Sequence, residues 1–95
     1  MSKVAILMNN IEQQYEGLRT SLGLIGQEKQ IQIFVIRHSI ESIGNYFSKN
    51  RELLISASVR CFSDNPINVE KFGFEYLSTA EIGDKLKNAD LVIPF

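Results

Sequence analysis

The stretch "KVAILMNN", residues 3–10, is an apolar run that stops at two asparagines. Between Val4 and Met8, apolar and β-branched residues follow one another without polar alternation, which is typical of a strand buried on both faces. Helices must then pack on both sides of the sheet to which this strand belongs. The stretch therefore predicts a strand over residues 3–8 in an α/β protein.

An amphipathic helix is predicted directly after this strand. Asn10 is suited to cap its first turn, and Gln13 follows at capping-box spacing. Gly26 suits a left-handed C-terminal cap. Between them, apolar residues recur at steps of four, three, four and three, which predicts one buried stripe that consists of Ile11, Tyr15, Leu18, Leu22 and Ile25.

The middle of the chain contains two further strand candidates separated by a helix. "IQIFVI" (31–36) is a second buried strand by the same criterion, and a helix is expected to begin near Ser39. The segment "RELL" (51–54) either continues this helix or forms a second short one. "ISASVRCF" (55–62) is the third predicted strand, which places Cys61 close to its carboxyl end.

The last third of the chain adds two strands and one helix. "SDNP" (63–66) is a turn, and "FGFEYL" (72–77) is a weak fourth strand. Ser78 and Glu81 have capping-box spacing before a helix, and "DLVIPF" (90–95) is the fifth strand. Because strands alternate with helices, the order predicts a three-layer α/β/α fold around a mostly parallel five-stranded sheet.

The composition restricts the class of protein and its partners. The chain has 95 residues, which suits one domain over residues 1–95, with 44% hydrophobic and 22% charged residues. The net charge of −1 gives no basic excess for nucleic acid, and no apolar stretch is long enough to cross a membrane. One cysteine and one histidine make a zinc site or an internal disulfide untenable. We expect a cytoplasmic protein that needs no cofactor or metal.

The candidate site follows from the strand order. In open α/β sheets, ligands and reactive groups collect beyond the carboxyl ends of the strands. That rule selects Asn9 and Asn10, then Arg37 and His38, then the segment from Cys61 to Asn65. A helix cap explains the asparagines equally well, and a solvated surface explains the charged residues.

Cys61 allows two interpretations. Free cysteine is among the most buried residue types, so it is either a small core residue or a reactive thiol. A reactive thiol needs a lowered pKa, which Arg60 beside it and His38 elsewhere in the chain are candidates to supply. With no second cysteine, any covalent product would be a persulfide or a mixed disulfide with another molecule.

Three stretches resemble the DsrE/DsrF-like family, which includes sulfur-relay proteins of the TusD type. "KVAILMNN" resembles the opening strand of that family, and "ISASVRC" resembles the strand that ends in its sulfur-carrying cysteine. "YLSTAEIGDKLKNADLVIPF" is similar to the closing strand, helix and strand. The resemblance runs over nearly the whole chain and implies a DsrE-like domain that forms homo- or hetero-oligomers.

The resemblance implies a persulfide carrier in intracellular sulfur transfer. Cys61 would accept sulfur from a donor protein and pass it to an acceptor protein, with Arg60 and His38 as auxiliary residues. The alternative is a non-catalytic oligomeric module of the same fold that binds a ligand or a protein, in which Cys61 is structural. For either, we expect a homo-oligomer that buries aromatic residues between subunits, namely Phe62, Phe72 and Phe74.

Overall fold

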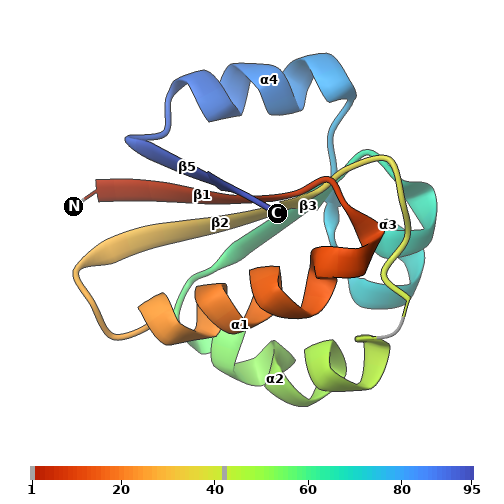
Figure 1. Ribbon diagram of the computed structural model, residues 1–95, viewed down its shortest axis with the longest axis horizontal. Helices are drawn as coiled ribbons and strands as arrows, with labels where there is room; N and C mark the ends of the chain where they lie inside the picture. The colour runs from red at the N-terminus through yellow and green to blue at the C-terminus, as the bar shows by residue number, and fades with distance from the viewer. Residues whose placement is uncertain (1, 42) are drawn as a thin grey trace.

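A computed structural model describes residues 2–41 and 43–95 and contains one five-stranded parallel sheet. The strand order is β4-β3-β2-β1-β5, and every neighbouring pair is parallel (Figure 1). The sheet confirms the fold class expected from the sequence. Its strands are β1 (Ser2–Met8), β2 (Lys29–Val35), β3 (Arg60–Ser63), β4 (Glu75–Tyr76) and β5 (Leu91–Pro94).

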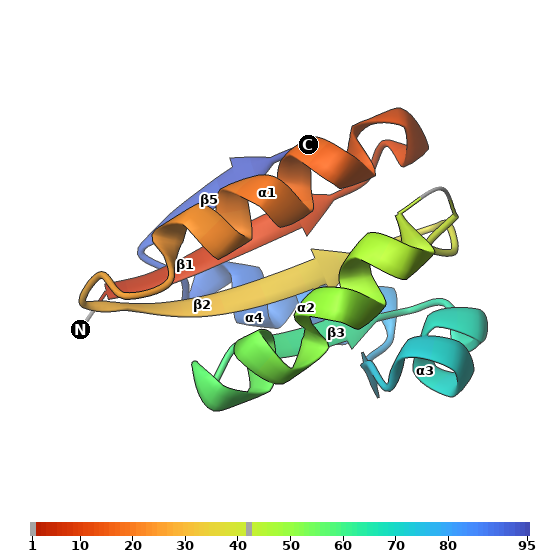
Figure 2. The same ribbon diagram turned by 90° about the horizontal axis from the view of Figure 1, so that it is seen from below.

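Helices cover both faces of the sheet and so make three layers. Helices α1 and α2 lie side by side on one face, and α4 lies on the other (Figures 1 and 2). Helix α3 is placed beyond the carboxyl end of β3. The helices are α1 (Gln14–Leu24), which follows a short 3-10 turn η1 (Ile11–Gln13), α2 (Gly44–Ser56), α3 (Pro66–Phe72) and α4 (Thr79–Lys87).

The two faces have separate cores. The face under α4 is small and is built around two stacked rings, Phe34 and Phe62, whose centroids are 5.2 Å apart. The larger core fills the space between the sheet and α1, α2 and α3. Its fully or nearly fully buried side chains include Val4, Ile6, Met8, Leu18, Ile33, Phe47 and Leu54.

The free edge of β5 is blocked by a proline. The N–H of Phe95 donates to the carbonyl of Leu7, and the carbonyl of Phe95 accepts from the N–H of Asn9. Because backbone groups alternate in direction along a strand, Pro94 faces away from β1 and offers no N–H there. Another strand therefore finds a poor hydrogen-bonding edge.

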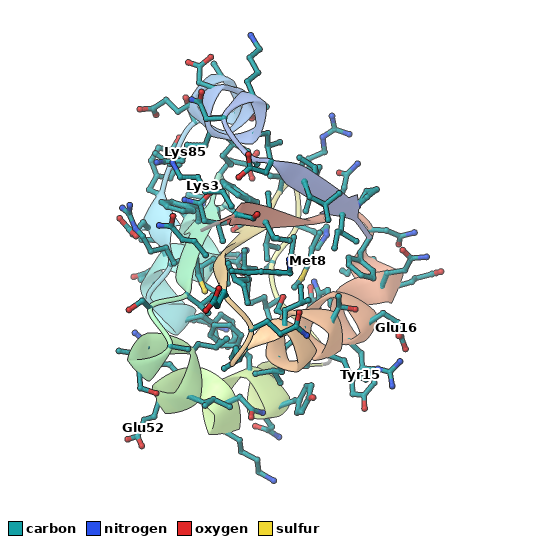
Figure 3. All side chains as sticks on the ribbon, turned by 90° about the vertical axis from the view of Figure 1, so that its left-hand side faces the viewer. Lys3, Met8, Tyr15, Glu16, Glu52 and Lys85 are labelled. Carbon is teal, nitrogen blue, oxygen red and sulfur yellow. The ribbon has the colours of Figure 1, made fainter. Side chains whose placement is uncertain are left out.

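Helix α1 is rotated relative to the predicted stripe. Ile11 is 44% exposed and Tyr15 is 50% exposed, so the prediction that they belong to the core is wrong. Tyr15 points outward and stacks on Tyr46 of α2, with ring centroids 5.2 Å apart (Figure 3). The buried face instead consists of Gln14, Gly17, Leu18 and Ser21.

Gly17 explains this rotation. A Cβ atom on Gly17 would lie 2.9 Å from two side-chain atoms of Met8, so the backbone of α1 lies directly against β1 at this point. Met8 projects from β1 toward α1 (Figure 3). Because α1 and β1 approach so closely, only a residue as small as Gly17 fits on the side of the helix that faces the sheet. The larger Tyr15 lies on the solvent-exposed side.

The third strand begins later than predicted. Helix α2 includes "RELL" and runs on to Ser56, so the strand predicted over residues 55–62 is wrong at its start. Ser58 then adopts a left-handed conformation, with φ of 59°, which turns the chain back toward the sheet. Only Arg60–Ser63 remain for β3.

The turn predicted over residues 63–66 leads directly into a helix, α3, which was not predicted from the sequence. The Asn65 side chain accepts from the N–H of Ile67, and Pro66 occupies the first turn, where its missing N–H costs nothing. Gly73 ends the helix with φ of 71°. The fourth strand shrinks accordingly to Glu75–Tyr76, and α2 begins at Gly44 rather than near Ser39.

Two glycines of α1 test the close contact between α1 and β1. We expect Gly17→Ala to lower the free energy of unfolding by about 1 kcal/mol, because overpacking against Met8 exceeds the gain in helix propensity. The matched control Gly23→Ala should raise it by about 0.5–1 kcal/mol, since a Cβ there meets nothing within 4 Å. Urea denaturation measures both values. Equal stabilisation by the two substitutions would contradict the contact.

Candidate functional site

The loops at the carboxyl edge of the sheet hydrogen-bond mainly to one another. Asp64 accepts from the backbone N–H of Arg37 at 2.9 Å and from the hydroxyl of Thr79 at 3.0 Å. It therefore joins the ends of β2 and β3 to the start of α4. Arg37 has a positive φ of 73°, and its exposed side chain forms no ion pair within the described residues.

Asn68 of α3 ties the loop after β2 to β3. Its side chain is fully buried, and its Oδ1 accepts from the N–H of Ile40 at 2.8 Å. Its Nδ2 donates to the carbonyl of His38 and to the hydroxyl of Ser63, both at 3.0 Å. One amide thus satisfies three polar groups, two from the loop after β2 and one from the end of β3.

His38 is held by Gln14 rather than by a group at Cys61. The Gln14 Oε1 accepts from the N–H of Glu41, so its Nε2 is the atom that donates to the Nδ1 of His38 at 2.9 Å. The imidazole proton is therefore assigned to Nε2. This nitrogen is buried and has no hydrogen-bond partner among the described residues.

The asparagine pair after β1 has a backbone role. The N–H groups of Asn9 and Asn10 both donate to the carbonyl of Phe95, at 2.8 and 3.1 Å. The side chain of Asn10 accepts from the N–H of Glu12 and caps η1, as the sequence predicted. The carboxyl edge is thus occupied by structural hydrogen bonds.

Cys61 lies away from that edge. It is the second residue of β3 and pairs with Ile33 of β2, whereas Ser63 is the last residue of the strand. Its side chain packs against the larger core, on the side of α1 and α2. The expectation that the thiol lies with the groups beyond the strand ends is therefore wrong, because β3 continues past Cys61 to Ser63 and the side chain at position 61 faces the larger core.

The two auxiliary residues are separated. Arg60 lies on the opposite face of β3, where its guanidinium carbon is 4.9 Å from the ring centroid of Phe62. It also forms two hydrogen bonds to the carboxylate of Glu75, at 2.8 and 3.0 Å. His38 stays at the carboxyl edge and is not one of the residues around the thiol.

A cavity of about 150 Å³ opens beside Cys61. It lies between the second half of α2, the start of β3 and the turn from α3 to β4. Because β4 pairs only with Phe62 and Ser63, the outer edge of β3 is uncovered at the level of Cys61. The lining consists of Phe47, Arg51, Leu54, Ile55, Val59, Arg60, Cys61, Phe72, Gly73 and Glu75.

Arg51 is the site residue that the sequence did not single out. Its Nη1 donates to the carbonyl of Phe72 at 2.7 Å, which carries the guanidinium from α2 across to the end of α3. A Cβ on Gly73 would collide with this guanidinium, so the glycine makes room for it. The contact joins residues 21 positions apart, which no local pattern reveals.

Burial dominates the ionisation of the thiol. It raises the pKa of Cys61 to about 12, and the positive charge of Arg51 lowers the pKa only partly. The carboxylate of Glu75 acts in the same direction as burial. At neutral pH, Cys61 is a neutral thiol and a poor nucleophile.

Residues 2–41 and 43–95 contain neither a cluster of metal-ligating side chains nor a membrane-spanning helix. In this part of the chain, no cluster of three or more His, Cys, Asp or Glu side chains is placed to hold a metal ion. None of its helices combines the length and the apolar character needed to cross a membrane.

Comparisons with known proteins add no relative. No family model, no curated protein and no solved structure matches this chain.

Removal of the Asn68 amide tests the hydrogen-bonded carboxyl edge. We expect Asn68→Ala to lower the free energy of unfolding by about 3 kcal/mol, because it leaves the N–H of Ile40 and the carbonyl of His38 without partners. The control is Asn88→Ala, at an exposed residue that caps α4. It should cost less than about 1 kcal/mol. Similar losses for both variants, measured in urea, would contradict the role of Asn68.

Proposed function

We propose that the chain is a small α/β module that binds a ligand non-covalently in the cavity beside Cys61. The observation that carries the proposal is an open cavity whose wall contains a half-buried thiol that its raised pKa keeps neutral. Cys61 is structural in this proposal: it forms part of the cavity wall together with Leu54 and Val59. A cavity lined largely by apolar and aromatic side chains, with few charged groups, is the usual form of a small-molecule site.

A second candidate function is a DsrE-like persulfide carrier. It is favoured by one observation, namely that Cys61 and Arg51 line the same cavity. The thiolate of Cys61 would attack the terminal sulfur of a donor persulfide. One sulfur–sulfur bond forms on Cys61 as the donor's bond breaks, and the donor leaves as a thiolate. The raised pKa of Cys61 opposes this reaction until a partner displaces the desolvating side chains.

Sulfur loading separates the two functions. The purified chain is incubated with a cysteine desulfurase and cysteine, and its intact mass is measured. Non-covalent binding predicts no added sulfur, and it predicts slow alkylation of the native thiol by iodoacetamide near neutral pH. A sulfur adduct on the wild type that disappears in Cys61→Ser would overturn the binding proposal and support the carrier. Alkylation of the urea-unfolded chain confirms that the reagent is active.

We also propose a cytoplasmic homo-oligomer. Phe62 and Phe74 are buried within the subunit, so the expectation that they form the interface is wrong. Phe72 also packs against the core of its own chain. The apolar groups that remain exposed include Leu53 and Ile55 of α2, and Leu91 of β5. Because Pro94 blocks the edge of β5, association through side chains is favoured over a continuous sheet.

Light scattering tests this association. A dimer or larger assembly at micromolar concentration is expected. Leu53→Glu should shift it toward the monomer, since a charge at a side chain that is 47% exposed and lies outside the cavity affects an interface far more than the fold. Arg19→Glu, at an exposed residue of α1, is the matched control. A monomeric mass for the wild type would contradict the proposal.

A further inference from the structure

We infer that the cavity beside Cys61 takes a small monoanion with an apolar body, of the class of aromatic or short-chain carboxylates, and that Arg51 recognises its charge. The inference rests on the proposed function, because it takes this cavity as the binding site. The volume of the cavity, the nature of its wall and its unbalanced charge each restrict the ligand.

The volume limits the ligand to a single ring or a short chain. The cavity has about 150 Å³. An apolar cavity of about this size holds one benzene molecule. A nucleotide, a flavin or a peptide side chain with two rings would not fit without movement of α2 or of the turn from α3 to β4.

The side chains that line the cavity favour a ligand with an apolar body. Phe47, Leu54 and Val59 present carbon atoms, and each of these residues is at least nine-tenths buried. Phe72 closes one side and meets Phe47 edge-on, with ring centroids 5.7 Å apart. A buried polar group would lose its hydrogen bonds to water against such a wall, whereas an aromatic ring or alkyl chain would lose none.

The charges at the mouth select an anion. Three residues with charged side chains contribute to the lining: Arg51, Arg60 and Glu75, of which Arg60 directs its guanidinium to the opposite face of β3. Arg60 and Glu75 form a bidentate pair and largely neutralise each other. Within the described residues, Arg51 has no carboxylate within ion-pair distance, so one positive charge remains unbalanced.

The guanidinium of Arg51 is held in place before any ligand binds. Its Nη1 is committed to the carbonyl of Phe72, and Gly73 lies directly beneath the group. An arginine side chain carries five N–H donors, so most of them remain for a ligand. A planar guanidinium pairs with a carboxylate through two parallel hydrogen bonds, which favours a carboxylate over a spherical anion.

Benzoate is the probe that combines these features. We expect benzoate to shift the amide NMR signals of residues around the cavity in a saturable way, with a dissociation constant on the order of millimolar for so small a ligand. Benzamide has almost the same shape but no charge, and it should bind about tenfold more weakly. Equal affinities, or shifts that do not saturate, would overturn the inference.

Two arginine variants test whether Arg51 recognises the charge of the ligand. Arg51→Met keeps the length and apolar character of the side chain, and it should weaken benzoate about tenfold while it leaves benzamide unchanged. Arg19→Met removes an exposed arginine of α1 and should change neither affinity. Thermal denaturation confirms that both variants are folded. If Arg51→Met proves unfolded, the comparison of benzoate with benzamide on the wild type decides the question.

The outcomes for the ligand class and for the proposed function are distinct. A sulfur adduct on Cys61 overturns non-covalent binding as the function, whatever benzoate does. Benzoate that fails to bind, with an unreactive thiol, overturns the ligand class and leaves the cavity open to another ligand.

Discussion

The length of α2 determines where the site lies. Because the helix continues to Ser56 and the chain turns at Ser58, β3 has only the four residues Arg60–Ser63. Cys61 lies within this strand because β3 continues to Ser63. Strand β4 pairs only with Phe62 and Ser63, so a cavity lies beside the thiol where no neighbouring strand covers β3. The thiol packs against the larger core from this position, and the resulting desolvation raises its pKa.

The carboxyl edge of the sheet and the cavity beside Cys61 therefore have different roles. At the carboxyl edge, Asp64 and Asn68 use their polar atoms to connect loops, which leaves few free groups for chemistry. On the side of α2, Arg51 brings a charge to an apolar cavity, supported by Gly73. Ligands of open α/β sheets usually bind beyond the strand ends. Here the stronger candidate lies beside the start of β3, at the level where β4 does not cover that strand.

The sequence predicted the parts of the fold that local patterns determine. Continuous apolar runs identified β1 and β2, and the capping box of Ser78 and Glu81 is present at the start of α4. It could not separate the end of α2 from β3, because "ISASV" suits either element. The buried face of α1 differs from the predicted apolar stripe because Gly17 packs closely on Met8. The periodicity of apolar residues does not reveal such a contact.

The site was predicted in part. Cys61 was identified, but Arg60 lies on the opposite face and Arg51 comes to the cavity through a tertiary contact with Phe72. The central claim is that the Cys61 thiol is neutral because it is buried. Titration of its Cβ chemical shift by NMR tests this directly. The account predicts an unchanged thiol well above pH 9, with a pKa of about 12. A midpoint below the free value of about 8.5 would contradict it and indicate a reactive thiolate.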